Sequence, residues 1–354
     1  MDSFRVMTWN VENLFLPPGG AGLAGERFGR KLDNLAALID DAAPTVLALQ
    51  EVGGAEALTC LQERLGHAMP HAALADPDRR GIRCAVLSTL PLQDQRQIRR
   101  FPPLVRPVQC RDPLFGDPAT PLTDVSVTDE SVTDESVTDR LGRPALEVTV
   151  VAGGVPVTIL NAHFKSKLIS YPPRGPAQAG SRHRPVDENE RYRYAAYALY
   201  RRTGEALALR DRANALLAGA GRERALVLCG DLNDGPDAAT TQVLQGPPGS
   251  EIGTAGFRTG DQGDGDRLWN LAALLNRRPD GSAASVPPFS RRFRDRGELI
   301  DHIFASHRLV NPDNRPQVRT LGSEQLASVT DRPAERADDV FPDHAALLAS
   351  FRLA

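Results

Sequence analysis

Two polar residues that can activate and orient a water molecule follow one buried strand. The apolar run from Ala225 to Gly230 predicts a strand buried on both faces, and Asp231 and Asn233 follow it. Alternate residues of an extended chain point to the same side, so these two side chains would lie side by side. A carboxylate there can accept a proton from water, and an amide can donate to an oxyanion. The alternative is a structural turn, which Asn and Asp favour.

The same arrangement, a buried strand that ends in polar residues, recurs along the chain. Strands are predicted over 4–9, 45–50, 155–160, 225–230 and 299–304, with a last one ending at residue 351. The polar residues beside these strands are Asn10, Glu12, Glu51, His163, Asp231, Asn233, Asp301, Asp343 and His344. Each alone has a structural explanation, since a strand-end acid is usually solvated and a lone histidine is usually hydrogen-bonded. Open α/β sheets gather functional groups at strand ends, so the set indicates one composite site.

The motifs around these residues, taken in order, resemble those of a known superfamily. The segments are Thr-Trp-Asn10, Leu-Gln-Glu51, Asn-Ala-His163, Gly-Asp231-Leu-Asn233, Ile-Asp301-His-Ile-Phe and Asp343-His344. They are similar to the endonuclease/exonuclease/phosphatase superfamily, which includes deoxyribonuclease I-like and exonuclease III-like enzymes. The resemblance implies an α/β fold, a four-layer sandwich of two packed mixed β-sheets flanked by helices. Because both ends of the chain would contribute to one site, we expect residues 1–354 to form a single domain.

The resemblance also implies a metal site. A phosphodiester is anionic and resists attack, so a hard cation is needed on a non-bridging oxygen. Glu51 is the predicted Mg²⁺ ligand, with Mn²⁺ as the alternative ion, and Glu12 and Asp343 complete the site through water. Asn10 supports these carboxylates or the phosphate.

The remaining motif residues are assigned to the chemistry on the water and the phosphate. Asp231, held with Asn233, is the predicted base that orients water. His344 and Asp301 form a pair in which the carboxylate fixes the imidazole and favours its charged form. The sequence leaves open whether this histidine takes the water's proton or only steadies the phosphoryl charge. His163 is expected to bind the scissile phosphate or to protonate the leaving oxygen.

Two lysines and a tyrosine-rich segment are candidate contacts to the substrate. Lys165 and Lys167 share the side of the strand-end histidine if the chain stays extended, which predicts phosphate contacts; a solvated strand end is the alternative. All five tyrosines fall within 171–200 among arginines, and such interleaving can bind a nucleic-acid strand. The helical spacing of Tyr197 and Tyr200 favours core-facing positions instead.

Two helices and one insertion complete the expected alternation of elements. Residues 31–41 and 187–219 are predicted helices, the second opened by the capping box Asp-Glu-Asn-Glu. A Ser-Val-Thr-Asp-Glu repeat runs from Ser126 to Asp139. We interpret residues 111–141 as a disordered acidic insertion with no catalytic role.

Composition excludes several other classes of protein. A hydrophobic fraction of 41% with 25% charged residues is ordinary for a globular protein. The formal charge of −3 gives no global attraction for polyanions, so such a site must be local. Four cysteines without CxxC spacing argue against a disulfide framework and against a zinc site. With no leader-like or membrane-spanning window, we expect a cytoplasmic enzyme without membrane or obligate protein partners.

The sequence therefore predicts a Mg²⁺-dependent phosphodiesterase that hydrolyses nucleic acid by metal-assisted attack of water on phosphorus. Endonuclease and exonuclease action stay open. The nearest alternative keeps the site and changes the substrate to an inositol phosphate or a phospholipid. A non-catalytic binding module would need a broken site, and every motif position is filled.

Overall fold

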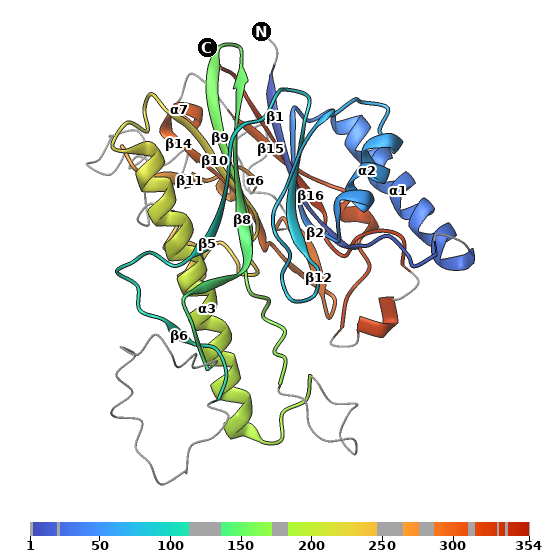
Figure 1. Ribbon diagram of the computed structural model, residues 1–354, viewed down its shortest axis with the longest axis vertical. Coiled ribbons are helices and arrows are strands. Elements are labelled where there is room, and N and C mark those ends of the chain that lie inside the picture. Colours follow the sequence, from blue (N-terminus) through green and yellow to red (C-terminus); the bar gives the residue numbers. More distant parts are fainter. Residues whose placement is uncertain are drawn as a thin grey trace.

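Two mixed β-sheets packed face to face form the centre of the molecule (Figure 1). The computed structural model describes residues 3–19, 22–112, 136–171, 183–245, 265–275, 287–310, 316–330, 333–336 and 339–353. The first sheet has the order β15 (Gln317–Leu321), β16 (Ala346–Phe351), β1 (Phe4–Leu14), β2 (Val46–Val52), β4 (Arg83–Ser88), β3 (His71–Leu74). The second has the order β11 (Leu268–Asn270), β14 (Asp301–Ser306), β10 (Ala225–Asp231), β9 (Val155–His163), β8 (Arg140–Ala152), β5 (Gln93–Arg100).

Helices on the outer faces complete four layers, which confirms the predicted sandwich. Helices α1 (Gly22–Ala42) and α2 (Ala55–Arg64) pack their buried leucines against the first sheet. Helix α3 (Glu188–Leu217) covers the second sheet, on the opposite side of the molecule (Figure 1). A further apolar cluster fills the space between the two sheets. Each layer therefore removes apolar surface from water on one or both faces, which is the main driving force of folding.

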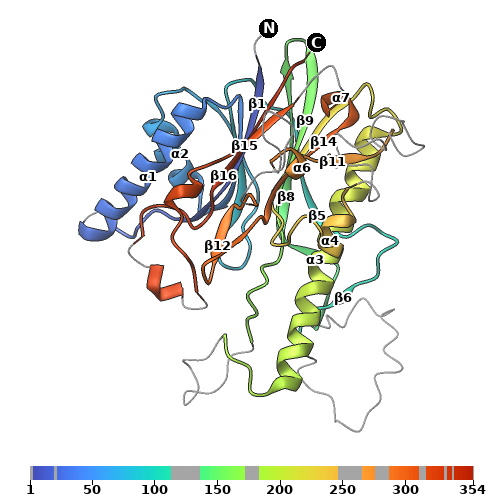
Figure 2. The same cartoon turned by 180° about the vertical axis from the view of Figure 1, so that it is seen from behind.

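Helix α3 begins and ends as its sequence predicts. The Asp187 carboxylate accepts a hydrogen bond from the Glu190 backbone N–H at 2.8 Å, and Ala218 ends the helix in the left-handed conformation. Its N-terminal half extends beyond the sheets (Figure 2). There Tyr197 is buried, as its spacing predicts, whereas Tyr200 is 45% exposed, so the core-facing prediction is wrong for that residue.

The C-terminal end of the predicted disordered insertion, residues 136–141, is ordered in the structure. Residues 113–135, with most of the repeat, lie outside the described residues. The last copy forms β7 (Val137–Thr138), which pairs with β6 (Val108–Gln109), and β8 begins at once. Disorder is therefore the wrong prediction for residues 136–141, because backbone pairing orders a segment that has little apolar side-chain area.

Short elements fill the remaining described segments. They are α4 (Ala239–Gln242), α6 (Ala272–Leu275), α7 (His307–Val310), the hairpin β12 (Arg291–Phe293) and β13 (Arg296–Glu298), and the 3₁₀ turns η3 (Ser323–Gln325) and η4 (Pro333–Arg336). Among the helices of the described residues, none has the length and apolar composition needed to cross a membrane.

The register of the second sheet places three functional side chains in one row. Asp231 on β10 pairs with His163 on the parallel strand β9 and with Asp301 on the antiparallel strand β14. Parallel neighbours end at the same edge of a sheet, so β9 and β10 deliver their terminal residues together. The row lies at the edge that faces the end of β1.

The first sheet supplies the opposite side of the site. Its parallel pair β1 and β2 sets Asn10 beside Gln50, directly before Glu51. Gln50 Nε2 donates to Asn161 Oδ1 of the second sheet at 2.7 Å, and both side chains are fully buried. This buried hydrogen bond fixes the two sheets relative to one another, although the other polar side-chain atom of Gln50, Oε1, has no hydrogen-bond partner among the described residues.

Candidate active site

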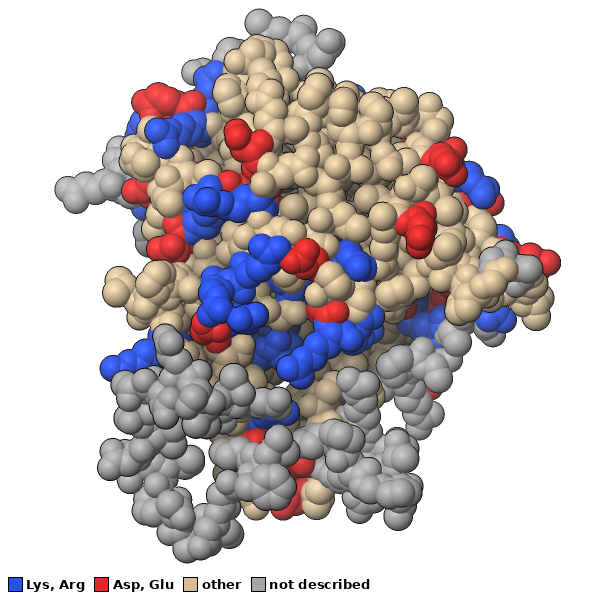
Figure 3. Space-filling view, viewed as in Figure 1, with Lys and Arg blue, Asp and Glu red and all other residues tan. Residues whose placement is uncertain are grey.

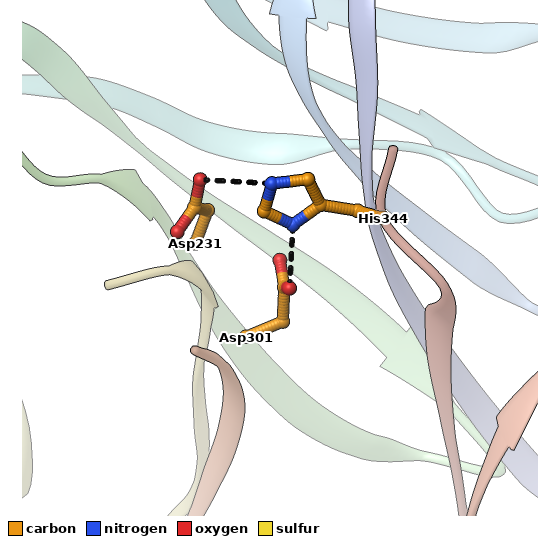
Figure 4. Close-up of side chains that lie close together, drawn as sticks. All are labelled: Asp231, Asp301 and His344. Atoms are coloured by element: carbon orange, nitrogen blue, oxygen red, sulfur yellow. Dashed lines mark hydrogen bonds and ion pairs between the residues drawn. The ribbon is translucent and has the colours of Figure 1, made fainter. Parts of the chain in front are cut away.

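His344 connects the two carboxylates that end β10 and begin β14. Its Nδ1 lies 2.7 Å from Asp301 Oδ2, and its Nε2 lies 3.8 Å from Asp231 Oδ2 (Figure 4). The turn that carries His344 is fixed to β1, because Trp9 Nε1 donates to the His344 carbonyl oxygen at 2.8 Å. This arrangement orients the imidazole through one nitrogen and directs the other into the site.

Opposing effects set the charge of His344. Burial lowers its pKa, but the carboxylates of Asp301, Asp343 and Asp231 outweigh burial and raise the pKa to about 10. The imidazole is therefore protonated at neutral pH. A protonated imidazole has no lone pair for a water proton. This charge state bears on the two roles that the sequence left open for the histidine.

Asp231 has the environment of a general base. Burial raises its pKa to about 7, an effect opposed by charged His344 and reinforced by Asp301. Asn10 Nδ2 donates to its Oδ2 at 3.0 Å, and the Asn233 backbone N–H donates to its Oδ1 at 2.9 Å. A carboxylate whose pKa lies near neutral pH is matched to proton transfer under those conditions.

Asn10 also reaches the carboxylate of Glu51. Its Nδ2 lies 3.3 Å from Glu51 Oε1, and Glu51 Oε2 accepts a hydrogen bond from the Asn13 N–H at 3.1 Å. The Glu51 side chain is 17% exposed, so its oxygens are partly open to solvent. Asn10 thus joins the Asp231 carboxylate of one sheet to the Glu51 carboxylate of the other.

His163 completes the group from β9. Its Nε2 lies 3.4 Å from Asp231 Oδ2 and 3.9 Å from Glu51 Oε1. Burial lowers its pKa well below the ordinary value, and the nearby cations Arg143 and His344 lower the pKa further. A neutral imidazole is a weak acid, but it can still donate a hydrogen bond from its protonated nitrogen.

The extended-chain prediction is wrong at Asn233. The residue has φ of +55°, and its side-chain Nδ2 donates to the Phe164 carbonyl oxygen at 3.1 Å. The turn interpretation therefore holds for this residue, whose backbone N–H still contacts the Asp231 carboxylate. Asn233 holds the loop in place from behind the site.

Backbone strain concentrates at the site. Of nine described non-glycine residues with positive φ, four are Glu12, Asn13, Glu51 and Asn233. The left-handed region costs most residues on the order of 1–2 kcal/mol. Such residues persist where surrounding contacts fix them, and they cluster at functional sites.

A model of the Endonuclease/Exonuclease/phosphatase family matches residues 7–324. The chain belongs to this family. No curated protein matches the chain. Similar solved structures include truncated TDP2 from Caenorhabditis elegans, with a TM-score of 0.53 and 13% identity over 99% of this chain and 98% of that one. The human Nocturnin catalytic domain with bound sulfate has a TM-score of 0.52 and 17% identity, over 99% of this chain and 95% of that one. An endonuclease/exonuclease/phosphatase from Bacteroides vulgatus has a TM-score of 0.52 and 15% identity, over 100% of both chains. At these identities the likeness shows the fold alone.

Members of the endonuclease/exonuclease/phosphatase family hydrolyse phosphoric esters and typically depend on a divalent metal. In the described part of the chain, Asp231, Asp301 and His344 bring ligand atoms within 4.8 Å of one another, a group that could hold a metal ion. His344 must lose its proton before it can bind one. The partly open Glu51 carboxylate needs no such change, because hard cations prefer carboxylate oxygen.

The two other carboxylates that the sequence predicts at the metal site, Glu12 and Asp343, are each paired with an arginine. Glu12 accepts hydrogen bonds from Arg336 Nε at 3.0 Å and from Arg336 Nη2 at 2.8 Å. Asp343 Oδ2 lies 3.5 Å from Arg291 Nε. The structure therefore places Glu12 and Asp343 beside the site with counter-charges of their own.

The predicted phosphate-binding lysines have other partners in the structure. Lys165 Nζ donates to the carbonyl oxygens of Ser166 and Leu168 at 2.9 and 3.0 Å. Burial lowers its pKa to about 8, and the nearby cation Arg201 lowers it as well. Lys167 Nζ lies 3.5 Å from Asp234 Oδ1. A phosphate would have to compete with these contacts.

Sequence reasoning missed several cations around the site. Arg143 Nη1 donates to the Phe164 carbonyl oxygen at 3.3 Å, next to His163, and Arg80 Nη2 lies 3.4 Å from Asn13 Oδ1. Figure 3 shows Lys and Arg side chains gathered over β5, β8 and the adjoining part of α3. The arginines beside the site belong to no recognisable motif, so no sequence pattern singled them out.

Proposed function

We propose that this protein is a Mg²⁺-dependent phosphodiesterase that hydrolyses nucleic acid through attack of water on phosphorus. The supporting observation is the set of contacts to one oxygen, Asp231 Oδ2. Asn10 Nδ2, His163 Nε2 and His344 Nε2 lie 3.0, 3.4 and 3.8 Å from it, and they come from three different strands or turns. Such convergence on a carboxylate with a raised pKa is typical of a hydrolytic centre.

The donor set fits a hard divalent cation at Glu51. Its carboxylate receives hydrogen bonds only from neutral groups, the Asn10 amide and the Asn13 backbone N–H, among the described residues. A cation there would therefore replace no existing ion pair. When bound, Mg²⁺ would supply positive charge to a non-bridging phosphate oxygen. Asn10 would keep the Glu51 carboxylate oriented.

The protein's own groups supply the rest of the chemistry. Asp231 accepts the proton of the attacking water, because its pKa near 7 leaves much of it ionised at neutral pH. Charged His344 stabilises the negative charge that develops on the phosphoryl oxygens. Asp301 holds His344 in place and favours its charged form. His163 donates a hydrogen bond to the phosphate from Nε2.

The local charge supports an extended anionic substrate. Arg80, Arg143 and Lys165 all lie near enough to His163 to lower its pKa, although the chain as a whole carries a formal charge of −3. Phosphates on either side of the scissile bond would meet these cations. This favours a nucleic-acid strand, which carries a phosphate at every nucleotide.

A substrate panel tests the proposal. Single- and double-stranded DNA, RNA, inositol phosphates and a phospholipid are incubated with the protein in Mg²⁺ or in EDTA, with Asp231→Asn as the inactive control. We expect acid-soluble nucleotides in Mg²⁺ and none in EDTA or from the variant. Free phosphate from inositol phosphates alone would favour the alternative substrate class. Equal rates for wild type and Asp231→Asn would contradict the assignment of the site.

A further inference from the structure

We propose that the Arg336 guanidinium takes the place of a second metal ion, so that the protein binds one divalent cation, at Glu51. The inference rests on the proposed metal-dependent function and deepens it. Three carboxylates lie on this side of the site: Glu12 and Glu51 near the ends of β1 and β2, and Asp343 shortly before β16. The structure separates them into a pair with built-in cations and a single carboxylate without one.

All three nitrogens of the Arg336 guanidinium contact oxygen atoms of the protein. It binds Glu12 through two parallel hydrogen bonds of 3.0 and 2.8 Å, its Nη1 lies 2.8 Å from Asp339 Oδ2, and its Nη2 donates to the Phe341 carbonyl oxygen at 3.0 Å. The side chain is 10% exposed. A guanidinium stays charged at any ordinary pH, and its fork matches a carboxylate. Arg336 therefore acts through Glu12 and does not reach substrate.

Two further cations balance the same carboxylate pair. Lys31 Nζ donates to the Glu12 carbonyl oxygen, and Arg291 Nε lies 3.5 Å from Asp343 Oδ2. Buried carboxylates without counter-charge are strongly unfavourable, and they either take up protons or bind metal. Arg336 and Arg291 supply Glu12 and Asp343 with counter-charges that a second metal ion would otherwise give.

The position of Glu51 is the opposite case. Its hydrogen bonds come from the Asn10 amide at 3.3 Å and from the Asn13 backbone N–H at 3.1 Å, and both donors are neutral groups. No guanidinium or ammonium pairs with the Glu51 carboxylate among the described residues. Among the described residues, the direct donors to Glu51 are thus all neutral, which leaves its oxygens available to a cation.

The Glu12–Arg336 pair has a positioning role as well. Glu12 Oε2 also accepts a hydrogen bond from the Asp343 backbone N–H at 3.0 Å, directly before His344. The fixed ion pair therefore anchors the turn that presents the imidazole. An exchangeable metal ion at this place would leave that turn dependent on the metal concentration.

Binding of Mn²⁺, followed by the electron paramagnetic resonance of the free ion, tests the inference without any substrate. We expect one bound Mn²⁺ per wild-type chain and two for Arg336→Gln, because the freed Glu12 and Asp343 carboxylates then gain the second ion. Glu12→Gln/Arg336→Gln should return to one. Arg64→Gln, which removes an exposed ion pair with Asp33, is the matched control and should keep one.

A second measurement covers the case in which Arg336→Gln does not fold. Glu12→Gln in the wild-type background should leave Mn²⁺ affinity nearly unchanged, whereas Glu51→Gln should weaken it by more than about 100-fold, the upper range for outer partners of a metal. Two Mn²⁺ ions in wild type, a single ion in folded Arg336→Gln, or loss of the ion in Glu12→Gln would overturn the inference. The proposed function fails separately, through absent hydrolysis with this stoichiometry intact.

Discussion

Removal of the Asp301 charge is the most informative perturbation of the site. Asp301→Asn keeps the size of a fully buried side chain and leaves a partner for His344 Nδ1, which lies 2.7 Å from the carboxylate. What changes is the charge that, more than any other, counteracts burial and raises the pKa of His344. The variant therefore tests whether His344 works in its protonated form.

The size of the effect follows from the His344 pKa. It is raised to about 10 from an ordinary value of 6.5, because Asp301, Asp343 and Asp231 outweigh burial. At pH 8 nearly every wild-type imidazole is then charged. If Asp301→Asn brings the pKa back to about 6.5, roughly one imidazole in thirty keeps its proton at pH 8. The ratio of variant to wild-type rate should then fall about 30-fold between pH 5.5 and pH 8.

The assay is kcat against pH for wild type, Asp301→Asn, His344→Ala and the double variant, each checked for folding by its melting temperature. His344→Ala should cost about 10² to 10³ in kcat, the usual range for loss of one group that stabilises developing negative charge. The double variant should lose little more than His344→Ala alone, because the pair acts as a unit. A pH-independent rate ratio, or rate losses that multiply in folded variants, would refute the reasoning.

Three further variants test other parts of the site. Glu51→Gln should abolish Mg²⁺-dependent hydrolysis without unfolding the protein, and exposed Glu56→Gln should change neither property; full activity in the first variant, or in EDTA, would contradict the metal assignment. Gly230→Ala should cost at least about 3 kcal/mol of unfolding free energy, because φ is +138° and an added Cβ would lie 1.9 Å from a backbone oxygen of β9. Gly29→Ala, with no heavy atom within 4 Å of its Cβ, should instead be neutral or stabilising, and equal losses in a urea titration would argue against the close approach. Asp231→Asn should abolish turnover and raise the melting temperature at pH 8 in EDTA. Burial raises the Asp231 pKa to about 7, so the folded state binds this proton more tightly than the unfolded chain does. The wild-type protein therefore loses stability as pH rises from about 4 to 7, and the variant does not. The gain should shrink as pH falls and vanish below about pH 4, and a destabilised variant at pH 8 would contradict the stated cause of the pKa shift.

Much of the fold was predictable because its signals are local. Apolar runs that end in polar residues gave β1, β2, β9 and β10, and the capping box gave the start of α3 at Glu188. The repeat was a local signal as well, but it misled at residues 136–141, where pairing of β7 with β6 supplies order that the composition does not indicate. Backbone pairing depends on a partner strand, which a window of sequence does not contain.

The candidate site, like the fold, was predictable from the sequence only in part. The sequence by itself determined which residues end the strands, because strand length and polar termini are written in consecutive residues. The resemblance named Glu51 as the metal ligand ahead of Glu12, but residue type and strand position alone do not separate two glutamates near the ends of buried strands. The tertiary structure gives them different partners, because it brings Arg336, 324 positions away, onto the carboxylate of Glu12 and leaves Glu51 to neutral donors. Burial likewise raised the pKa of Asp231, and surrounding carboxylates raised that of His344. Charge balance and desolvation depend on every neighbour in space, and only the folded chain specifies those neighbours.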